Sequence, residues 1–246
     1  MSACVRFEGV THAFGSGPAS TPVLSDVDLA FGERRTTAIV GESGSGKSTL
    51  LKMVNGLLVP DRGRVEVFGA PVDPGALVAL RRRIGYAVQG SALFPHLSVD
   101  DNVTLLARFE GWDAARIAGR TAHLFDLMEL PRALGARFPH ELSGGQQQRA
   151  ALCRAMMLEP PLLLLDEPFS AVDPITRAGI HEHFERLART EDVSVVLVTH
   201  DLHEAITLAD DLVVLGEGRV LQADTVDAVR AAPAAPWIDR LLETQR

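Results

Sequence analysis

Cysteine is nearly absent from this 246-residue chain, which contains only Cys4 and Cys153. The two lie far apart, and no metal-ligand spacing surrounds either of them. A disulfide framework is therefore not expected, which suits a reducing compartment such as the cytoplasm. We expect both thiols to be buried or incidental.

Long apolar runs are absent too, since no segment approaches the ~20 residues that a membrane-spanning helix needs. The first eight residues, MSACVRFE, include no apolar signal core. If the protein serves a membrane, the sequence predicts that it does so from the cytoplasmic side and through a partner.

Aromatic residues make up only 5% of the chain although hydrophobic residues make up 46%, so we expect the aliphatic core that is typical of parallel sheets. The formal net charge of −8 argues against a general affinity for nucleic acid, which needs a basic surface. The length allows one large domain or two intimate subdomains.

Continuous apolar stretches predict buried strands at residues 36–40, 162–166 and 194–199. The alternation between Leu24 and Phe31 predicts further strands near the amino terminus. Apolar residues on both sides of Gly216-Glu217-Gly218 predict a late hairpin.

Helical spacing follows residue 49 and predicts a helix that Pro60 and Gly63 end. Residues 90–161 contain helical candidates, among them 113–130, and no convincing strand, which predicts a helical insertion. Residues 224–246 are typical of a short helical tail.

A phosphate loop follows the strand at 36–40 and fits the pattern Gly-x-x-x-x-Gly-Lys-Ser. Its glycines let backbone N–H groups close on phosphates, and the helix that it opens adds a partial positive charge. Lys47 should reach the β- and γ-phosphates, and the Ser48 hydroxyl should bind Mg²⁺. The predicted nucleotide-contacting residues are Gly41, Glu42, Ser43, Gly44, Ser45, Gly46, Lys47, Ser48 and Thr49.

Two acids, Asp166 and Glu167, end a strand of four leucines. Acids at the carboxyl end of a buried parallel strand lie at the ligand-binding edge of the sheet. Asp166 is placed to hold Mg²⁺, directly or through water, and Glu167 to orient and activate the attacking water. An ordinary solvated strand end is the alternative, which the phosphate loop disfavours.

The segment Leu142-Ser143-Gly144-Gly145-Gln146 precedes an apolar helical run, so we expect Ser143 to cap a helix whose glycines admit a phosphate. A simple helix cap is the commoner meaning of Ser-Gly-Gly. In this order, however, the three motifs resemble those of the ATP-binding subunit of ABC (ATP-binding-cassette) systems, over about Val5 to Ala223.

The resemblance implies roles for Ser143, Gly144, Gly145 and Gln146, which in the family bind the γ-phosphate of the ATP held by the other subunit. The implied unit is an ATP-dependent head-to-tail dimer of two copies, with two ATP molecules in composite sites. It also implies an α/β fold: a P-loop NTPase (RecA-like) core with a mainly parallel sheet, an N-terminal antiparallel β subdomain and an inserted α-helical subdomain.

Four further positions match family motifs. Gln89 resembles the Gln loop, which senses Mg²⁺ and the γ-phosphate and faces the membrane partner, and His200 resembles the switch histidine, which contacts the γ-phosphate. Asp173 ends a segment that resembles the D loop of the dimer interface, with Val172 where leucine is usual. Phe14 resembles the aromatic residue that stacks on adenine, where tyrosine is commoner; a core phenylalanine is its alternative.

The resemblance also predicts one ABC ATPase domain over residues 1–246. Its parts are an ATP-binding core with the β subdomain at 1–89 and 162–223, a helical signature subdomain at 90–161 and a helical tail at 224–246. The seven other histidines are interpreted as structural: His12, His96, His123, His140, His181, His183 and His203.

Segments 93–99, 139–149 and 173–177 look like those of bacterial binding-protein-dependent importers, and 51–57 is similar to osmoprotectant uptake systems. Many such cassettes carry C-terminal regulatory domains, and from the end of the sequence at Arg246 we expect this subunit to lack them. The implied protein hydrolyses ATP and energises the uptake of a quaternary amine, such as glycine betaine or choline. It would lie peripherally on the cytoplasmic face of the inner membrane.

The implied partners are integral membrane permease subunits, a second copy of the chain and, indirectly, a solute-binding protein, with no nucleic acid. One alternative is an importer ATPase for another small solute, such as an amino acid; another is a soluble non-transport ABC ATPase of the iron–sulfur-assembly type. A nucleic-acid or translation machine is less consistent with the acidic charge and the length of the chain. A nucleotide-binding module without turnover is less consistent with the presence of Glu167 and His200.

Overall fold

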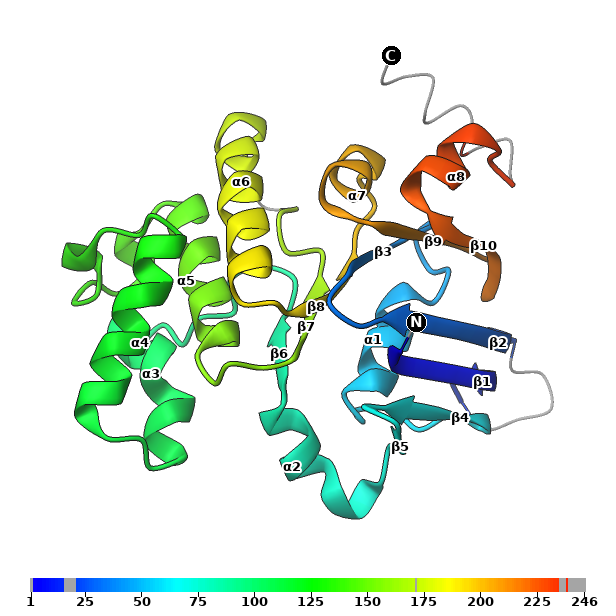
Figure 1. Cartoon of the computed structure of the whole chain (residues 1–246), viewed down its shortest axis with the longest axis horizontal. Helices are drawn as coiled ribbons and strands as arrows, with labels where there is room; N and C mark the ends of the chain where they lie inside the picture. The colour runs from blue at the N-terminus through cyan, green and yellow to red at the C-terminus, as the bar shows by residue number, and fades with distance from the viewer. Residues whose placement is uncertain (1, 16–20, 171, 235–237, 239–246) are drawn as a thin grey trace. The chain divides into compact units, whose positions relative to one another are not determined.

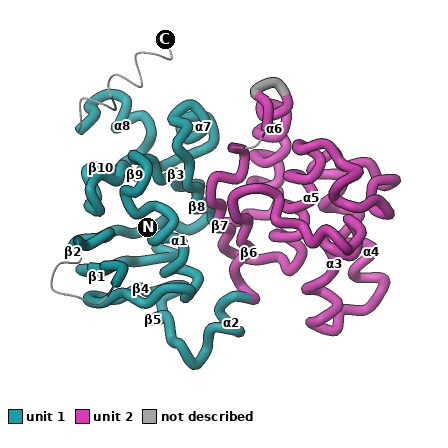
Figure 2. Tube along the Cα trace, turned by 180° about the vertical axis from the view of Figure 1, so that it is seen from behind, with its two compact units in different colours: residues 1–81, 194–246 teal, residues 82–193 magenta. Residues whose placement is uncertain are grey.

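The computed structural model describes residues 2–15, 21–170, 172–234 and 238. The chain forms two compact units (Figure 2). Unit 1 comprises residues 1–81 and 194–246, and unit 2 comprises residues 82–193. The single domain predicted over residues 1–246, with its boundaries at 89/90 and 161/162, stays a prediction.

Unit 1 begins with an antiparallel sheet in the order β2-β1-β4-β5 (Figure 1). Its strands are β1 (Ala3–Ala13), β2 (Pro22–Gly32), β4 (Arg62–Val67) and β5 (Ala70–Pro71). Buried residues alternate with exposed ones along β2, so one face of the sheet packs into the core. The predicted N-terminal strands are confirmed.

The second group of strands in unit 1 has the order β10-β9-β3-β8. The central strand β3 (Thr36–Val40) pairs in parallel with β8 (Ser194–Val198) and with β9 (Asp211–Gly216). All five residues of β3 and of β8 are buried, as continuous apolar strands require. β10 (Arg219–Thr225) pairs antiparallel with β9, which confirms the predicted hairpin.

Helix α1 (Lys47–Val54) ends earlier than predicted, and the assignment of its end to Pro60 and Gly63 is wrong. Gly56 has a φ of 63°, and a Cβ there would lie 2.3 Å from Leu77 Cδ2. The N–H of Leu57 then donates back to the carbonyl of Lys52 at 2.7 Å. A left-handed glycine with such a bond closes a helix, and apolar spacing alone does not reveal it because Leu57 is an exposed residue past the end.

Short helices complete unit 1: η1 (Pro74–Ala76), α2 (Leu77–Arg82, whose last residue belongs to unit 2), α7 (Leu202–Leu208) and α8 (Val226–Ala231). Helix α7 packs against β3, and α8 packs against β9 and β10. The predicted tail 224–246 therefore contains a helix, but its residues 235–237 and 239–246 lie outside the described residues.

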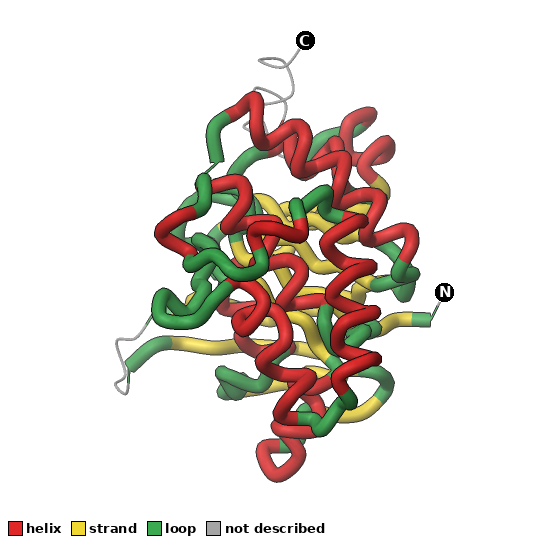
Figure 3. The backbone as a smooth tube through the Cα atoms, turned by 90° about the vertical axis from the view of Figure 1, so that its left-hand side faces the viewer, coloured by secondary structure: helices red, strands yellow, loops and turns green. Residues whose placement is uncertain are grey.

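Unit 2 contains the parallel pair β6 (Ile84–Ala87) and β7 (Leu162–Asp166), which together with unit 1 confirms the predicted α/β class. Its helices are α3 (Val99–Phe109), α4 (Ala114–Leu127), η2 (Arg132–Leu134), η3 (Pro139–Glu141), α5 (Gly144–Met156) and α6 (Pro174–Thr190). Helices α3, α4 and α5 pack on one another (Figure 1). Residues 90–161, all of them described, form helices and turns with no strand, as predicted (Figure 3).

Both cysteines are buried and unpaired, which confirms the interpretation of the thiols. Burial raises the pKa of Cys153 to about 12 and also raises the pKa of Cys4. Since the thiolate is the reactive form, neither cysteine is activated for chemistry.

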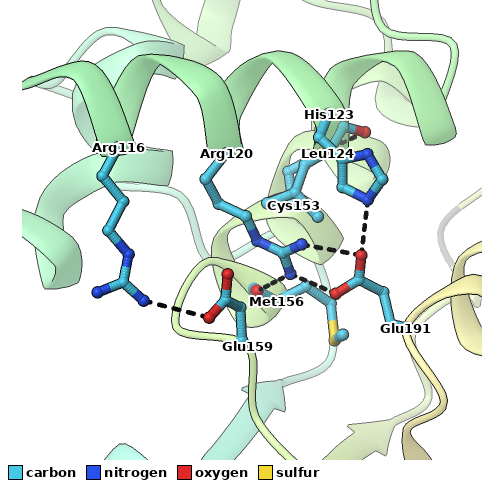
Figure 4. Close-up of polar contacts among 8 residues, drawn as sticks. All are labelled: Arg116, Arg120, His123, Leu124, Cys153, Met156, Glu159 and Glu191. Atoms are coloured by element: carbon cyan, nitrogen blue, oxygen red, sulfur yellow. Dashed lines mark hydrogen bonds and ion pairs between the residues drawn. The ribbon is translucent and has the colours of Figure 1, made fainter.

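A buried ion pair in unit 2 joins the middle of α4 to the residue that follows α6 (Figure 4). Glu191, which follows α6, accepts hydrogen bonds from both terminal nitrogens of Arg120 at 2.6 and 2.8 Å. Arg120 also donates to the carbonyl of Met156 at 2.8 Å, and His123 Nε2 lies 2.8 Å from Glu191 Oε1. The side chains of Arg120 and Glu191 are only 8% and 10% exposed.

We predict that Glu191→Gln lowers the free energy of unfolding by about 3 kcal/mol at pH 7, because it leaves the Arg120 charge buried without its counter-ion. Burial raises the pKa of Glu191, but the hydrogen bonds and charges of Arg120 and His123 outweigh burial and hold it below its usual range. The pair therefore stabilises the folded state at pH values above the pKa of a glutamate in the unfolded chain. This stabilisation is lost as the pH falls through the lower pKa that Glu191 has in the folded chain.

Urea unfolding followed by circular dichroism at several pH values measures both the loss of unfolding free energy in Glu191→Gln and its dependence on pH. Glu159→Gln is the matched control, because the pair of Glu159 with Arg116 is about half exposed and should contribute no more than about 0.5 kcal/mol (Figure 4). Equal losses in the two variants would contradict the special stability of the buried pair.

Candidate nucleotide site

The loop at residues 41–46 joins β3 to α1 in unit 1. Gly46 is the N-cap of α1, and no side chain caps the helix there. With a φ of 103°, Gly46 also lies so close to its neighbours that a Cβ would be 2.6 Å from Leu24 Cδ2 and 2.9 Å from the carbonyl of Val23. The loop thus presents uncapped backbone N–H groups at a helix amino terminus, which is the arrangement that binds phosphate.

Lys47 supplies a positive charge inside this loop. Its side chain donates from Nζ to the carbonyls of Gly41 and Glu42 at 2.8 and 2.9 Å, and only 7% of the residue is exposed. Ser45 Oγ is also buried, and it has no hydrogen-bond partner in the part of the chain that the structure describes. A held ammonium beside an unsatisfied hydroxyl fits a ligand with many acceptor oxygens, such as a triphosphate.

His200 lies in the turn between β8 and α7, where its side chain is exposed. The turn is well defined, because the N–H of Asp201 donates to Thr199 Oγ1 at 3.0 Å and Asp201 caps α7. Phe14 is 55% exposed, and its ring meets the ring of His12 edge-on at 5.0 Å. The exposure excludes the alternative of a core phenylalanine.

The predicted acids of unit 2 end β7, with Glu167 in a left-handed backbone conformation (φ of 48°). The hydroxyl of Ser170 donates to the carbonyl of Glu167 at 3.0 Å and closes the turn. A non-glycine residue with this φ is strained, and such strain is concentrated at functional sites. Nearby, burial and then the charge of Asp166 raise the pKa of Tyr86 to about 12.

Gln89 and Glu167 are brought together, although they are 78 positions apart in the sequence. Gln89 Nε2 donates to Glu167 Oε2 at 3.4 Å. The contact arises because β6 and β7 are parallel neighbours, so the residues that follow them meet at one edge.

Ser143 caps α5, as predicted. Its Oγ accepts from the N–H of Gln146 at 3.3 Å, and Gln146 Oε1 accepts from the N–H of Ser143 at 3.0 Å, which completes a capping box. Ser143 and Gly144 are exposed whereas Gly145 is buried. Asp173 caps α6 by accepting from the N–H of Thr176 at 3.0 Å, and residue 171 before it lies outside the described residues.

A protein-family model described as "ABC transporter" matches residues 24–170, more than half of the sequence. The chain belongs to the ABC transporter family.

Two curated relatives align with most of the chain but are longer than it. The glycine betaine/carnitine/choline transport ATP-binding protein OpuCA of Bacillus subtilis is 39% identical over 98% of the chain and 63% of its own length. The Fe(3+) ions import ATP-binding protein FbpC of Pseudomonas fluorescens is 46% identical over 86% of the chain and 60% of its own length. The chain thus spans less than two thirds of either relative.

A solved structure supports the fold of the family. A dimeric ATP-binding cassette in a post-hydrolysis state, bound to ADP and Pi, matches 90% of this chain and 98% of its own, with a TM-score of 0.81 and 31% identity. This likeness confirms the predicted P-loop fold class.

Among the described residues, no three His, Cys, Asp or Glu side chains converge as a metal site, and no helix is long and apolar enough to cross a bilayer. Mg²⁺ does not require such a cluster, since it takes one or two carboxylates beside substrate phosphates and water.

Sequence reasoning missed Asn102 on α3, which is fully buried. Its side chain accepts from the N–H of Phe94 at 2.7 Å and donates to the carbonyls of Phe94, Leu97 and Ser98 at 3.0 to 3.1 Å. Asn102 therefore holds the segment that follows the Gln89 turn. No sequence pattern reveals this, because all its partners are backbone atoms.

Proposed function

We propose that this chain is the ATP-binding and ATP-hydrolysing subunit of a binding-protein-dependent importer. The observation that carries the proposal is the loop at 41–46, which ends at an uncapped helix amino terminus and whose Gly41 and Glu42 carbonyls hold the buried ammonium of Lys47. The family supplies the context, and Glu167, held by Gln89, supplies a candidate base for hydrolysis.

Different residues contact the phosphates and the adenine of the nucleotide. Lys47 and the N–H groups of residues 41–49 bind the phosphates, and exposed Phe14 stacks on adenine. Ser143, Gly144, Gly145 and Gln146 bind the γ-phosphate of an ATP held by a second copy, with Asp173 at the same dimer interface.

Mg²⁺ would be held by Ser48, Gln89 and Asp166. A hydroxyl, an amide and a carboxylate offer the oxygen donors that this ion prefers, so the residues fit it. The ion would neutralise charge on the phosphates during transfer.

Hydrolysis then depends on the chain's own side chains. Glu167 orients the attacking water and accepts its proton, while the hydrogen bond from Gln89 holds the carboxylate in place. Lys47 stabilises charge that develops on the transferred phosphoryl group, and His200 contacts that group from the end of β8.

The partners in this proposal are integral membrane permease subunits, a second copy of the chain and, through the permease, a solute-binding protein. The chain would work at the cytoplasmic face of the membrane. A quaternary amine is the first candidate solute, because OpuCA is named for the transport of glycine betaine, carnitine and choline and aligns with 98% of the chain. Another small solute, such as ferric ion, is the second, because FbpC shares the higher identity.

Purification of the tagged chain from gently solubilised native membranes, followed by mass spectrometry, tests the importer role. A co-purifying permease with a solute-binding protein would support it, and binding of glycine betaine or iron to that protein would choose the solute. Only soluble partners from a folded preparation that hydrolyses ATP would overturn the importer role and leave a non-transport ATPase.

Phe14→Ala is expected to weaken ATP binding about tenfold, because stacking of a base on an aromatic ring is worth ~1–3 kcal/mol. Calorimetric titration with a non-hydrolysable ATP analogue measures the loss. Phe109→Ala is the control, since Phe109 is a 77% exposed phenylalanine of unit 2 with no proposed role. Unchanged affinity in Phe14→Ala would remove Phe14 from the adenine site.

A further inference from the structure

Gln147, on the first turns of α5, uses both ends of its side chain in unit 2. Its Oε1 accepts a hydrogen bond from Ser91 Oγ at 3.0 Å. Its Nε2 donates to the carbonyls of Pro139 and Leu142 at 2.9 and 3.3 Å. One side chain therefore links the segment that follows Gln89 to the turn that precedes Ser143.

A second contact from α5 holds the same segment. Arg154 donates to the carbonyl of Ala92 at 2.8 Å, and its guanidinium lies 5.7 Å from the centre of the Phe94 ring. Burial lowers the pKa of Arg154. The segment 91–94 thus contacts α5 at two points, two turns of helix apart.

The backbone of this segment needs such support. Gly90 and Ala92, on either side of Ser91, have φ values of 72° and 43°. For Ala92 this conformation is unfavourable and persists only where surrounding contacts hold it. Displacement of Gln147 should therefore disturb the Ser91 turn, and displacement of the turn should disturb Gln147.

We infer that Gln147 is a positioning residue that couples the conformation of the Gln89 segment to that of the phosphate-binding end of α5. The inference rests on the proposed function, in which Gln89 and Ser143 contact nucleotide. The carbonyls of Pro139 and Leu142 flank the turn that sets the entry of the chain into the capping box of Ser143. A movement at Ser91 is thereby transmitted to the turn at 139–142 through a single side chain.

A double-mutant cycle of Ser91→Ala and Gln147→Ala tests the coupling, with kcat and KM for ATP measured on the chain in complex with its permease. We expect each single variant to lower kcat about fivefold, as loss of a hydrogen bond predicts, with KM for ATP within twofold of wild type. The double variant should be no slower than the slower single variant. If the two losses in kcat multiplied in the double variant, or if only KM for ATP changed, the coupling would be overturned.

Two further variants separate the ends of the side chain. Gln147→Lys retains a donor for the two carbonyls but no acceptor for Ser91, so its kcat should equal that of Ser91→Ala. Gln222→Ala, which removes a glutamine bonded to the backbone of residues 232 and 234 in unit 1, should leave kcat unchanged. A wild-type kcat in Gln147→Lys would overturn the role of Ser91.

Amide hydrogen exchange of the chain gives a readout that does not depend on hydrolysis. Ser91→Ala should accelerate exchange at residues 139–146 as well as at 90–94. Acceleration confined to 90–94 would overturn the inference while leaving the proposed function intact. Absence of ATP hydrolysis by the wild-type complex would instead contradict the proposed function.

Discussion

Glu167→Gln is expected to lower kcat for ATP hydrolysis by about a hundredfold or more and to leave ATP binding nearly unchanged. A general base contributes about 10²–10⁴-fold to a reaction, and an amide cannot accept the proton of the attacking water. The change is nearly isosteric, and an amide oxygen can still accept the hydrogen bond that Gln89 donates. The variant should therefore accumulate as an ATP-bound dimer, visible by size-exclusion chromatography with Mg²⁺ and ATP.

Glu159→Gln is a close control for this experiment. Glu159 is also a glutamate of unit 2 with a positive φ, 55° against 48° for Glu167. Its variant makes the same chemical change in a similarly strained backbone and should keep wild-type turnover. Near wild-type kcat in Glu167→Gln would remove Glu167 from the role of base, whereas equal losses in both variants would point to backbone strain instead.

Lys47→Ala is expected to weaken ATP binding by about a hundredfold, with hydrolysis lost at physiological ATP. Charge-assisted hydrogen bonds are about twice as strong as neutral ones, and this ammonium is largely removed from water inside the loop. Binding of a non-hydrolysable ATP analogue, measured by calorimetry, gives the affinity without interference from turnover.

Lys52→Ala controls for the loss of a positive charge on the same helix, because Lys47 and Lys52 are the only lysines in the chain. Lys52 is exposed, so its removal should change affinity less than twofold. Circular dichroism must show that Lys47→Ala keeps its fold. A folded Lys47→Ala with unchanged affinity would contradict the assignment of the loop.

Together, Glu167→Gln and Lys47→Ala separate ATP binding from hydrolysis. Glu167→Gln should bind ATP and retain it, and Lys47→Ala should fail to bind it. If both variants lost affinity for ATP and neither lost turnover, the site would be a binding module rather than an ATPase.

Local motifs were the part of this protein that its sequence determined by itself. The strand, loop and helix at 36–54, the cap at Ser143 and the acids at the end of β7 follow from contiguous residues whose spacing dictates both backbone and chemistry. The end of α1 could not be read in the same way, because the left-handed Gly56 stops the helix while the apolar spacing continues.

Contacts between distant residues were decided only by the tertiary structure. Gln89 reaches Glu167 because two strands pair in parallel, and Arg120 reaches Glu191 across 71 positions because α4 packs against α6. Asn102 and Gln147 bond mainly to backbone carbonyls, which every residue possesses. Such partners leave no mark in the sequence, so only the folded chain shows which carbonyls are within reach.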